Sequence, residues 1–301
     1  YEFGRFNIMS DLLSNQYKPK IKLKIGDVYR SVSNTVKAHN LNTVCAEANC
    51  PNIYECWNRG TATIMILGDI CTRACGFCSV KTGKPLWDDA LEPHRTAMAV
   101  KKMNLKHVVI TSVDRDDLKN DYGASIWQKT VLAIKNINPD CTIEILTPDF
   151  RFYKPALDIV FISKPDIFSH NVECVERISK EIRKQSDWNR SLDVLKYAVK
   201  NNMLTKTGMM VGLGETDEEV FETMRIVRGV GVEIFNIGQY LQPTKNHLKV
   251  QRYVDPEIFK LYKQFGEEIG FKVVESGPLV RSSYHADKQA RDYGELDRLS
   301  I

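Results

Sequence analysis

Cys71-Thr-Arg-Ala-Cys75-Gly-Phe-Cys78 is the stretch that most constrains this chain: three cysteines within eight residues, soon after the apolar run Thr63–Leu67. Four thiolates close a tetrahedral zinc site or give each iron of a four-iron cluster a protein ligand, whereas three leave one metal position open. A small molecule can bind at an open position. A zinc knuckle or a cluster of buried thiols is the alternative interpretation of this triplet alone.

Short β-rich runs alternate with longer amphipathic runs outward from this triplet, which predicts βα units and a parallel sheet. The predicted strands are Thr63–Leu67, His107–Ser112, Thr142–Leu146, Ile167–His170, Thr205–Val211 and Glu233–Ile237. The predicted helices include Ser191–Asn201, Asp217–Val230 and Pro256–Ile269, the last two with Thr216 and Asp255 as N-caps. Six such units make an α/β fold, a partial (β/α)6 TIM-like barrel.

The composition agrees with a single-domain enzyme that has a barrel fold. The chain has 301 residues, 43% hydrophobic and 27% charged, enough for one barrel-type domain. No apolar run reaches membrane-spanning length, and a net charge of +4 on scattered lysines argues against a nucleic-acid partner. The basic stretch Lys18–Lys24 is either a solvated face or a docking surface for an acidic partner.

Eight cysteines in clustered positions indicate metal binding in a reducing compartment rather than disulfides. We expect a cytoplasmic protein, or a mitochondrial matrix protein if a transit peptide has been removed. Cys141 and Cys174 fall in or beside apolar patterns and are predicted to be bystanders.

A separate cysteine triplet, Cys45, Cys50 and Cys56, lies upstream with gaps of four and five residues. These gaps match neither the paired CxxC of zinc ribbons nor the plant-type ferredoxin run. We expect an N-terminal extension over residues 1–60 that carries this triplet and covers one end of the barrel. The barrel itself is expected over residues 61–270 and a C-terminal segment over residues 271–301.

The motifs identify a family. The Cys71–Cys78 spacing resembles the signature of radical S-adenosylmethionine enzymes. The upstream triplet, Trp57 and Arg281-Ser-Ser-Tyr284 resemble the lipoyl synthase family. Residues 61–69, 111–118, 146–150, 170–173, 212–216, 238–244 and 276–284 are similar to that family as well, so the resemblance runs from about residue 25 to about residue 290.

The resemblance implies that Cys71, Cys75 and Cys78 hold a 4Fe-4S cluster whose fourth iron binds S-adenosyl-L-methionine. Homolytic cleavage of this molecule then yields methionine and a 5′-deoxyadenosyl radical. For its contacts we predict Phe77 beside the adenine, together with Thr111, Ser112, Glu144, Asn171 and Arg183. Each also has a structural interpretation, since Glu144 in an alternating strand would face solvent and Arg183 lies in a charged helical run.

The resemblance also implies a reaction: insertion of two sulfur atoms, at C6 and C8 of an octanoyl chain on a lysine of a carrier protein. A second 4Fe-4S cluster, held by Cys45, Cys50, Cys56 and a serine, is the sulfur source in this family. We assign Ser283 rather than Ser282, and an alkoxide is a harder, more easily protonated ligand than a thiolate. Arg281 is expected to anchor the motif.

The implied partners are octanoylated lipoyl domains of 2-oxoacid dehydrogenase E2 subunits and the glycine cleavage H protein, a ferredoxin or flavodoxin reductant, and an iron-sulfur cluster carrier. Two alternatives remain at this stage. One is another radical enzyme with an auxiliary cluster, such as a biotin synthase-like sulfur inserter or a peptide-modifying enzyme. The other is a non-catalytic iron-sulfur electron carrier, which requires fully ligated clusters.

Overall fold

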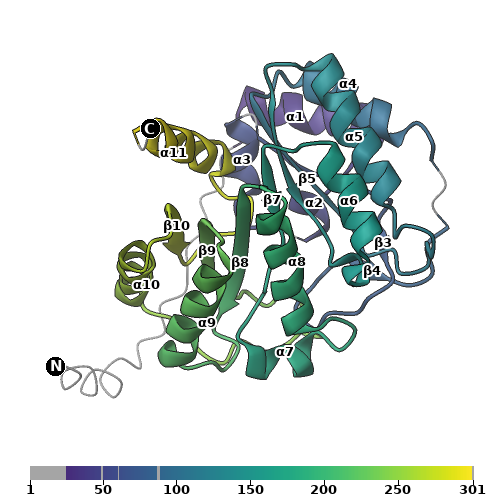
Figure 1. The fold of residues 1–301 in the computed structure, drawn as a ribbon. Coiled ribbons are helices and arrows are strands. Elements are labelled where there is room, and N and C mark those ends of the chain that lie inside the picture. The colour runs from purple at the N-terminus through teal and green to yellow at the C-terminus, as the bar shows by residue number, and fades with distance from the viewer. Residues whose placement is uncertain (1–24, 49, 60, 87–88, 300–301) are drawn as a thin grey trace.

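An eight-stranded sheet forms the centre of the computed structural model, which describes residues 25–48, 50–59, 61–86 and 89–299 (Figure 1). Its strands, in spatial order, are β1 (Asn42–Thr43), β2 (Thr63–Ile66), β5 (His107–Ser112), β6 (Thr142–Leu146), β7 (Ile167–Ser169), β8 (Thr205–Val211), β9 (Ile234–Gln239) and β10 (Val273–Gly277). All neighbours pair in parallel except β1 with β2. Within the described residues β1 and β10 do not pair with each other, so the barrel is partial.

Helices connect the parallel strands and cover the outer face of the sheet (Figure 1). They are α4 (Glu92–Lys102), α5 (Ala124–Ile137), α6 (Lys154–Ile162), α7 (Glu176–Ile182), α8 (Trp188–Lys200), α9 (Asp217–Val230) and α10 (Pro256–Glu268). A 3-10 turn, η1 (Phe150–Phe152), precedes α6. Repeated crossovers of this kind place successive strands side by side, with all their carboxyl ends at one rim.

Capping residues set the helix starts. Thr216 accepts a hydrogen bond from the backbone N–H of Glu219, and the Glu219 side chain accepts one from the backbone of Thr216, a capping box that confirms the predicted start of α9. Asp255 caps α10, as predicted. α8 begins at Trp188 rather than at the predicted Ser191, because Asp187 accepts a hydrogen bond from the backbone N–H of Arg190.

The α/β partial-barrel prediction is confirmed, and its strand count is corrected. All six predicted strands are present: β5, β6 and β8 have the predicted bounds, and β2, β7 and β9 differ by one or two residues at their ends. β10 was not predicted and adds a seventh parallel strand beside β9. Its run Val-Val-Glu-Ser-Gly is short and half polar, so pairing with β9 rather than local pattern makes it a strand. The expected boundary at residue 271 therefore separates β10 from a sheet to which it belongs.

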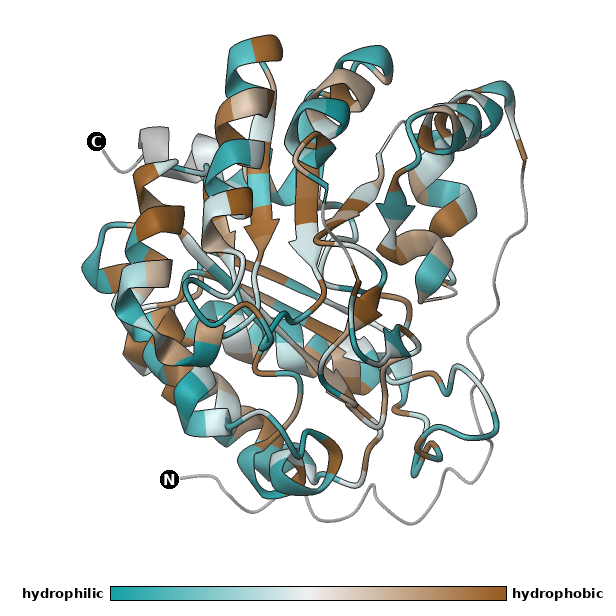
Figure 2. Cartoon of the chain, turned by 90° about the vertical axis from the view of Figure 1, so that its right-hand side faces the viewer, coloured by the Kyte–Doolittle hydropathy of each residue, from teal (hydrophilic) through white to brown (hydrophobic). Residues whose placement is uncertain are grey.

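Alternation along each strand divides the side chains between two faces of the sheet. Val108 and Ile110 are fully buried in a cluster with residues of α4 and α5, on the outer side. His107, Val109 and Thr111 point to the concave side, because successive strand residues face opposite ways. In Figure 2 the strands carry much of the brown apolar colour, while the surrounding helices alternate between brown and teal. The helices therefore close the outer core and leave the concave face for polar groups.

The first described helices and the last one lie together beside the sheet. The helices α1 (Asp27–Ala38), α2 (Val44–Glu47) and α3 (Ile53–Asn58) pack around a small core that includes Val32 and Trp57. The C-terminal helix α11 (Ala286–Leu299) contacts β5 and β10, and an ion pair of 3.1 Å joins Arg59 to Asp287. The basic stretch Lys18–Lys24 lies outside the described residues. No helix within the described part of the chain has the length and apolar character to cross a membrane.

Candidate active site

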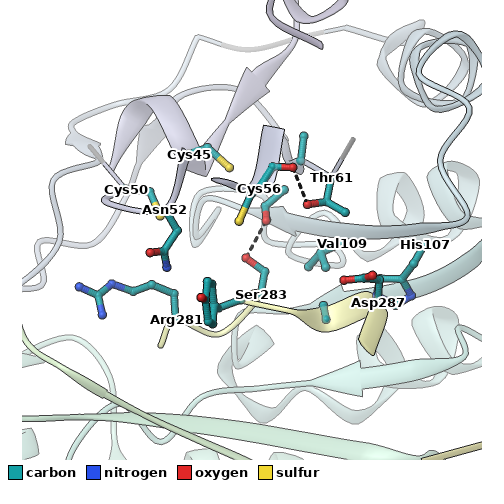
Figure 3. Close-up of a pocket in the computed structure, with 14 residues that line it drawn as sticks. Cys45, Cys50, Asn52, Cys56, Thr61, His107, Val109, Arg281, Ser283 and Asp287 are labelled. Atoms are coloured by element: carbon teal, nitrogen blue, oxygen red, sulfur yellow. Dashed lines mark hydrogen bonds between the residues drawn. The ribbon is translucent and has the colours of Figure 1, made fainter. Parts of the chain in front are cut away.

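The upstream cysteine triplet and the C-terminal tail line one pocket (Figure 3). Cys45 lies in α2, Cys56 in α3, and Cys50 in the turn between these helices. Arg281 and Ser283 face them from the tail that follows β10. The pocket encloses about 440 Å³, including the part open to solvent. Tertiary folding thus brings together three thiols, a hydroxyl and a guanidinium from opposite ends of the chain.

The two serines of the tail point to different places. Ser283 lines the pocket, and its Oγ lies 2.7 Å from Thr63 Oγ1. Ser282 instead accepts a hydrogen bond of 2.7 Å from Asn171 Nδ2, at the end of β7. The position of Ser283 therefore agrees with its assignment as the fourth ligand, which remains a prediction.

Burial keeps the three thiols of this pocket protonated in the absence of metal. Burial first and the neighbouring Cys45 second raise the pKa of Cys50 to about 11 and that of Cys56 to about 12. The pKa of Cys45 is also raised by burial. Three thiolates this close repel one another unless cationic metal compensates their charge. The donor set fits an iron-sulfur cluster, and the half-buried Arg281, whose charge acts on Cys50, is suited to balance its negative charge.

The other cysteine triplet lies at the opposite end of the strands. Thr63 and His107, which line the pocket described above, are the first residues of β2 and β5. Cys71 comes after the carboxyl end of β2, in the two-residue strand β3 (Ile70–Cys71), which pairs with β4 (Lys81–Thr82). The concave face of the barrel therefore separates the two cysteine sites.

Backbone contacts hold the Cys71–Cys78 loop in place. The N–H of Gly76 donates to the carbonyl of Ile182 at 2.8 Å, and the N–H of Leu248 donates to the carbonyl of Gly76 at 3.1 Å. A Cβ on Gly76 would approach the Leu248 side chain to 3.1 Å, so the close packing of this loop favours glycine here. Phe77 is half-buried and packs against the core formed by the second half of the sheet.

Arg73, between the first two cysteines of this loop, is the centre of a buried ionic network. Its guanidinium contacts Asp114 at 3.1 Å, Asp116 at 2.8 Å and Asp149 at 2.6 Å. Burial alone would raise the pKa of Asp149, but the hydrogen bond and charge of Arg73 hold it well below its usual range. The network ties the cysteine loop to the residues that follow β5 and β6. Arg73 was not among the predicted site residues, although its place inside the triplet was a signal.

The electrostatics of this loop resemble those of the first site. Burial raises the pKa of Cys71 to about 11 and that of Cys75 to about 12. Two backbone N–H groups, those of Arg73 and Asp114, donate to Cys71 Sγ at 3.4 Å each. Such donors favour the thiolate once metal is bound. The loop is therefore a preformed holder for a metal cluster rather than a set of reactive free thiols.

Four of the residues predicted to contact S-adenosylmethionine lie at the same rim as this loop. Thr111 and Ser112 end β5, and their hydroxyls donate to the carbonyls of Leu146 and Val113. Asn171 comes shortly after the carboxyl end of β7, and its side chain donates a hydrogen bond to Ser282. Arg183 is buried close enough to Cys75 to lower the pKa of that thiol, against the effect of burial. Their roles remain predictions.

Glu144 differs from its expected role. It is fully buried on the concave side of β6, where its carboxylate accepts from Lys206 Nζ at 3.0 Å and from Ser169 Oγ at 2.9 Å. A buried cation already neutralises this carboxylate, so in this structure it is not free to pair with a ligand's ammonium group. The expected alternative, a solvent-facing Glu144, does not hold either.

No three His, Cys, Asp or Glu side chains in the described part of the chain converge as one metal ion requires. The described cysteines form no disulfides, and Cys141 and Cys174 are buried and do not line the auxiliary pocket.

The chain is similar to known proteins over most of its length. The Radical SAM superfamily model matches residues 65–227, which include the Cys71–Cys78 loop. A lipoyl synthase of Flavobacterium psychrophilum is 53% identical over 270 residues, covering 89% of this chain and 93% of the relative. A mitochondrial lipoyl synthase of Nematostella vectensis is 50% identical over 275 residues, covering 90% of this chain and 94% of the relative.

Solved structures share the fold at low identity. Streptococcus suis SuiB bound to S-adenosylmethionine has a TM-score of 0.58 at 12% identity, covering 76% of this chain and 55% of that one. Methylornithine synthase has a TM-score of 0.54 at 12% identity, covering 84% and 79%. At these identities the likeness extends to the barrel alone.

Proposed function

The chain belongs to the lipoyl synthase family of the radical S-adenosylmethionine superfamily, and from this premise we propose how its two cysteine sites share the work. It is a sulfurtransferase that inserts sulfur at C6 and C8 of a protein-bound octanoyl-lysine. Its substrates are accordingly proteins that become lipoylated. The division of labour between the two sites is the proposal.

The radical site is the Cys71–Cys78 loop. Cys71, Cys75 and Cys78 would hold a cluster there, which when bound would supply the electron that cleaves the sulfonium of S-adenosylmethionine. Arg183, near Cys75, is suited to the carboxylate of that ligand, and Asn171, Thr111 and Ser112 supply polar contacts at the rim. Phe77 offers an aromatic face for the adenine. The three cysteines of the loop are half-buried, so a bound ligand has to exclude the remaining water, because an alkyl radical needs a dry site.

The auxiliary site is the pocket of Cys45, Cys50, Cys56 and Ser283. We propose that these residues hold a second 4Fe-4S cluster, which is consumed as the source of sulfur and is in that sense a substrate. The observation that carries this proposal is the meeting of the three thiols with Ser283 in one pocket. An oxygen ligand is harder than a thiolate, so the iron it binds is the one released most easily. Arg281 compensates charge beside Cys50.

The proposed partners follow from this chemistry. Lipoyl domains of E2 subunits and the glycine cleavage H protein would present the octanoyl-lysine, a ferredoxin or flavodoxin would supply electrons, and a cluster carrier would rebuild the auxiliary site. The described cysteines are all free thiols, which supports a reducing compartment, either the cytoplasm or a mitochondrial matrix.

Iron counting after anaerobic reconstitution tests the division of labour. Wild type should bind about eight irons and Cys45→Ala about four. The variant should still release 5′-deoxyadenosine from S-adenosylmethionine and should form no lipoyl product. Cys141→Ala is the matched control, since this buried cysteine belongs to neither triplet and does not line the auxiliary pocket, and it should keep both clusters. A Cys45→Ala protein that retains eight irons, or that still makes product, would contradict the proposal.

A further inference from the structure

Thr63 stands at the junction between the barrel and the auxiliary pocket. It is the first residue of β2, it is 5% exposed, and it lines the pocket. In the sheet it pairs with Val109, so both side chains face the concave side. Its Oγ1 lies 2.7 Å from Ser283 Oγ, which is the geometry of a hydrogen bond between hydroxyls.

We propose that Thr63 is a positioning residue, whose hydroxyl holds the oxygen of Ser283 toward the auxiliary cluster and keeps it bound there. The inference rests on the proposed function, in which Ser283 is an iron ligand. A serine oxygen that binds iron has lost its proton, so in that state it can only accept a hydrogen bond from Thr63. A donor at this distance orients the serine oxygen and stabilises the charge that the oxygen carries as a ligand.

The backbone of the tail is anchored independently of Thr63. Asn236 Nδ2, on β9, donates to the carbonyls of Arg281 and Ser282 at 3.2 and 3.1 Å. The N–H of Tyr284 closes a turn onto the carbonyl of Arg281 at 2.9 Å. The Thr63 contact therefore orients a side chain on a segment whose path is already set, and its loss should leave the fold intact.

Thr63 could also act on the auxiliary cluster through Cys45, and the test has to distinguish this route from the one through Ser283. The backbone N–H of Thr63 also donates to the sulfur of Cys45. The hydroxyl of Thr63 has one proton, which it gives either to Ser283 or to Cys45, and both contacts with Cys45 oppose the rise in the pKa of that thiol that burial causes. Substitution of Thr63 would then affect the cluster through Cys45 rather than through Ser283. A double-variant cycle distinguishes these routes, because residues that act through one another are not additive.

The test uses a protein that holds only the auxiliary cluster. In a full-length background with Cys71, Cys75 and Cys78 changed to alanine, the reconstituted cluster is challenged with an iron chelator and the loss of its visible absorbance is followed. Thr63→Val, which keeps shape and removes the donor, should lose iron roughly ten times faster or more, the size expected when a hydrogen bond to a charged group is removed. Thr63→Ser should restore the rate to within about twofold, since it keeps the hydroxyl.

Thr205→Val is the matched control. Thr205 starts β8 as Thr63 starts β2, is 1% exposed, and its hydroxyl has no hydrogen-bond partner among the described residues. This variant should leave the rate of iron loss unchanged. The Mössbauer spectrum adds a second readout: the iron bound to oxygen should shift in Thr63→Val and not in Thr205→Val.

The cycle decides the route. Thr63→Val combined with Ser283→Ala should lose iron no faster than Ser283→Ala alone. Additive rates, or a Thr63→Val rate equal to that of the background while Ser283→Ala is faster, would overturn the inference and leave the proposed function standing. If Ser283→Ala itself matches the background, the assignment of Ser283 as a ligand fails, and the role of Thr63 fails with it.

Discussion

The two cysteine sites of this protein are built in opposite ways. Cys71, Cys75 and Cys78 come from one loop, whose ends are joined by the pairing of β3 with β4. The auxiliary pocket joins α2 and α3 to a tail from the other end of the chain. Closing a long chain segment costs more conformational entropy than closing a short loop, so the auxiliary site depends more on the stability of the whole fold. Local damage should therefore disable the radical site alone, whereas damage to the tail should disable the auxiliary site.

Removal of Arg73 should break this comparison most strongly. Arg73→Met leaves Asp114, Asp116 and Asp149 without their shared cation, and loss of one partner from a buried pair costs about 3–5 kcal/mol. Urea unfolding of the metal-free protein measures this loss. After reconstitution the variant should keep about four irons, those of the auxiliary site. Arg177→Met, which removes an exposed ion pair with Glu219, is the control and should change stability by less than about 1 kcal/mol.

Acid should weaken the radical end of the barrel through His170. Burial lowers the pKa of this imidazole to about 4, and its Nδ1 bonds to the carbonyl of Thr147 at 2.9 Å. In the unfolded chain this imidazole takes up a proton near pH 6.5. The neutral imidazole therefore contributes its full share of the free energy of unfolding above pH 6.5, and that share is lost as the pH falls toward 4. The loss should reach about 3 kcal/mol. Urea unfolding across this range should give a flatter pH profile for His170→Asn; parallel curves would contradict the prediction.

Ser282→Ala should have the smallest effect and should sharpen the contrast between the two serines. It removes one hydrogen bond to Asn171, worth about 1 kcal/mol, so binding of S-adenosylmethionine should weaken roughly fivefold. Equilibrium binding to the reconstituted protein measures this change. The iron content should stay at about eight, as in wild type. Loss of iron from Ser282→Ala to the level of Ser283→Ala would mean that the assignment of the two serines is wrong.

Periodicity and capping residues were enough to predict most of the barrel. β5, β6 and β8 match their predicted bounds, because alternating or continuous apolar runs of that length have few other uses. β10 was not predicted, because its residues become a strand only through pairing with β9. The start of α8 escaped because Asp187, a short polar residue in a charged run, was not recognised as a cap.

The Cys71–Cys78 loop could be identified as a metal site from local spacing, since its three cysteines lie close together in any conformation of so short a segment. The meeting of Cys45, Cys50 and Cys56 with Ser283 was expected from family resemblance, and no local pattern could have supplied it. The partners of Arg73, the ion pair of Glu144 with Lys206, and the contact of Thr63 with Ser283 all depend on strands that fold side by side. Side chains far apart in a sequence become partners only when packing sets their distance and excludes water. The sequence therefore determined that this chain can hold metal clusters, through the number and spacing of its cysteines. The fold decided that the two cysteine sites lie at opposite ends of the barrel strands.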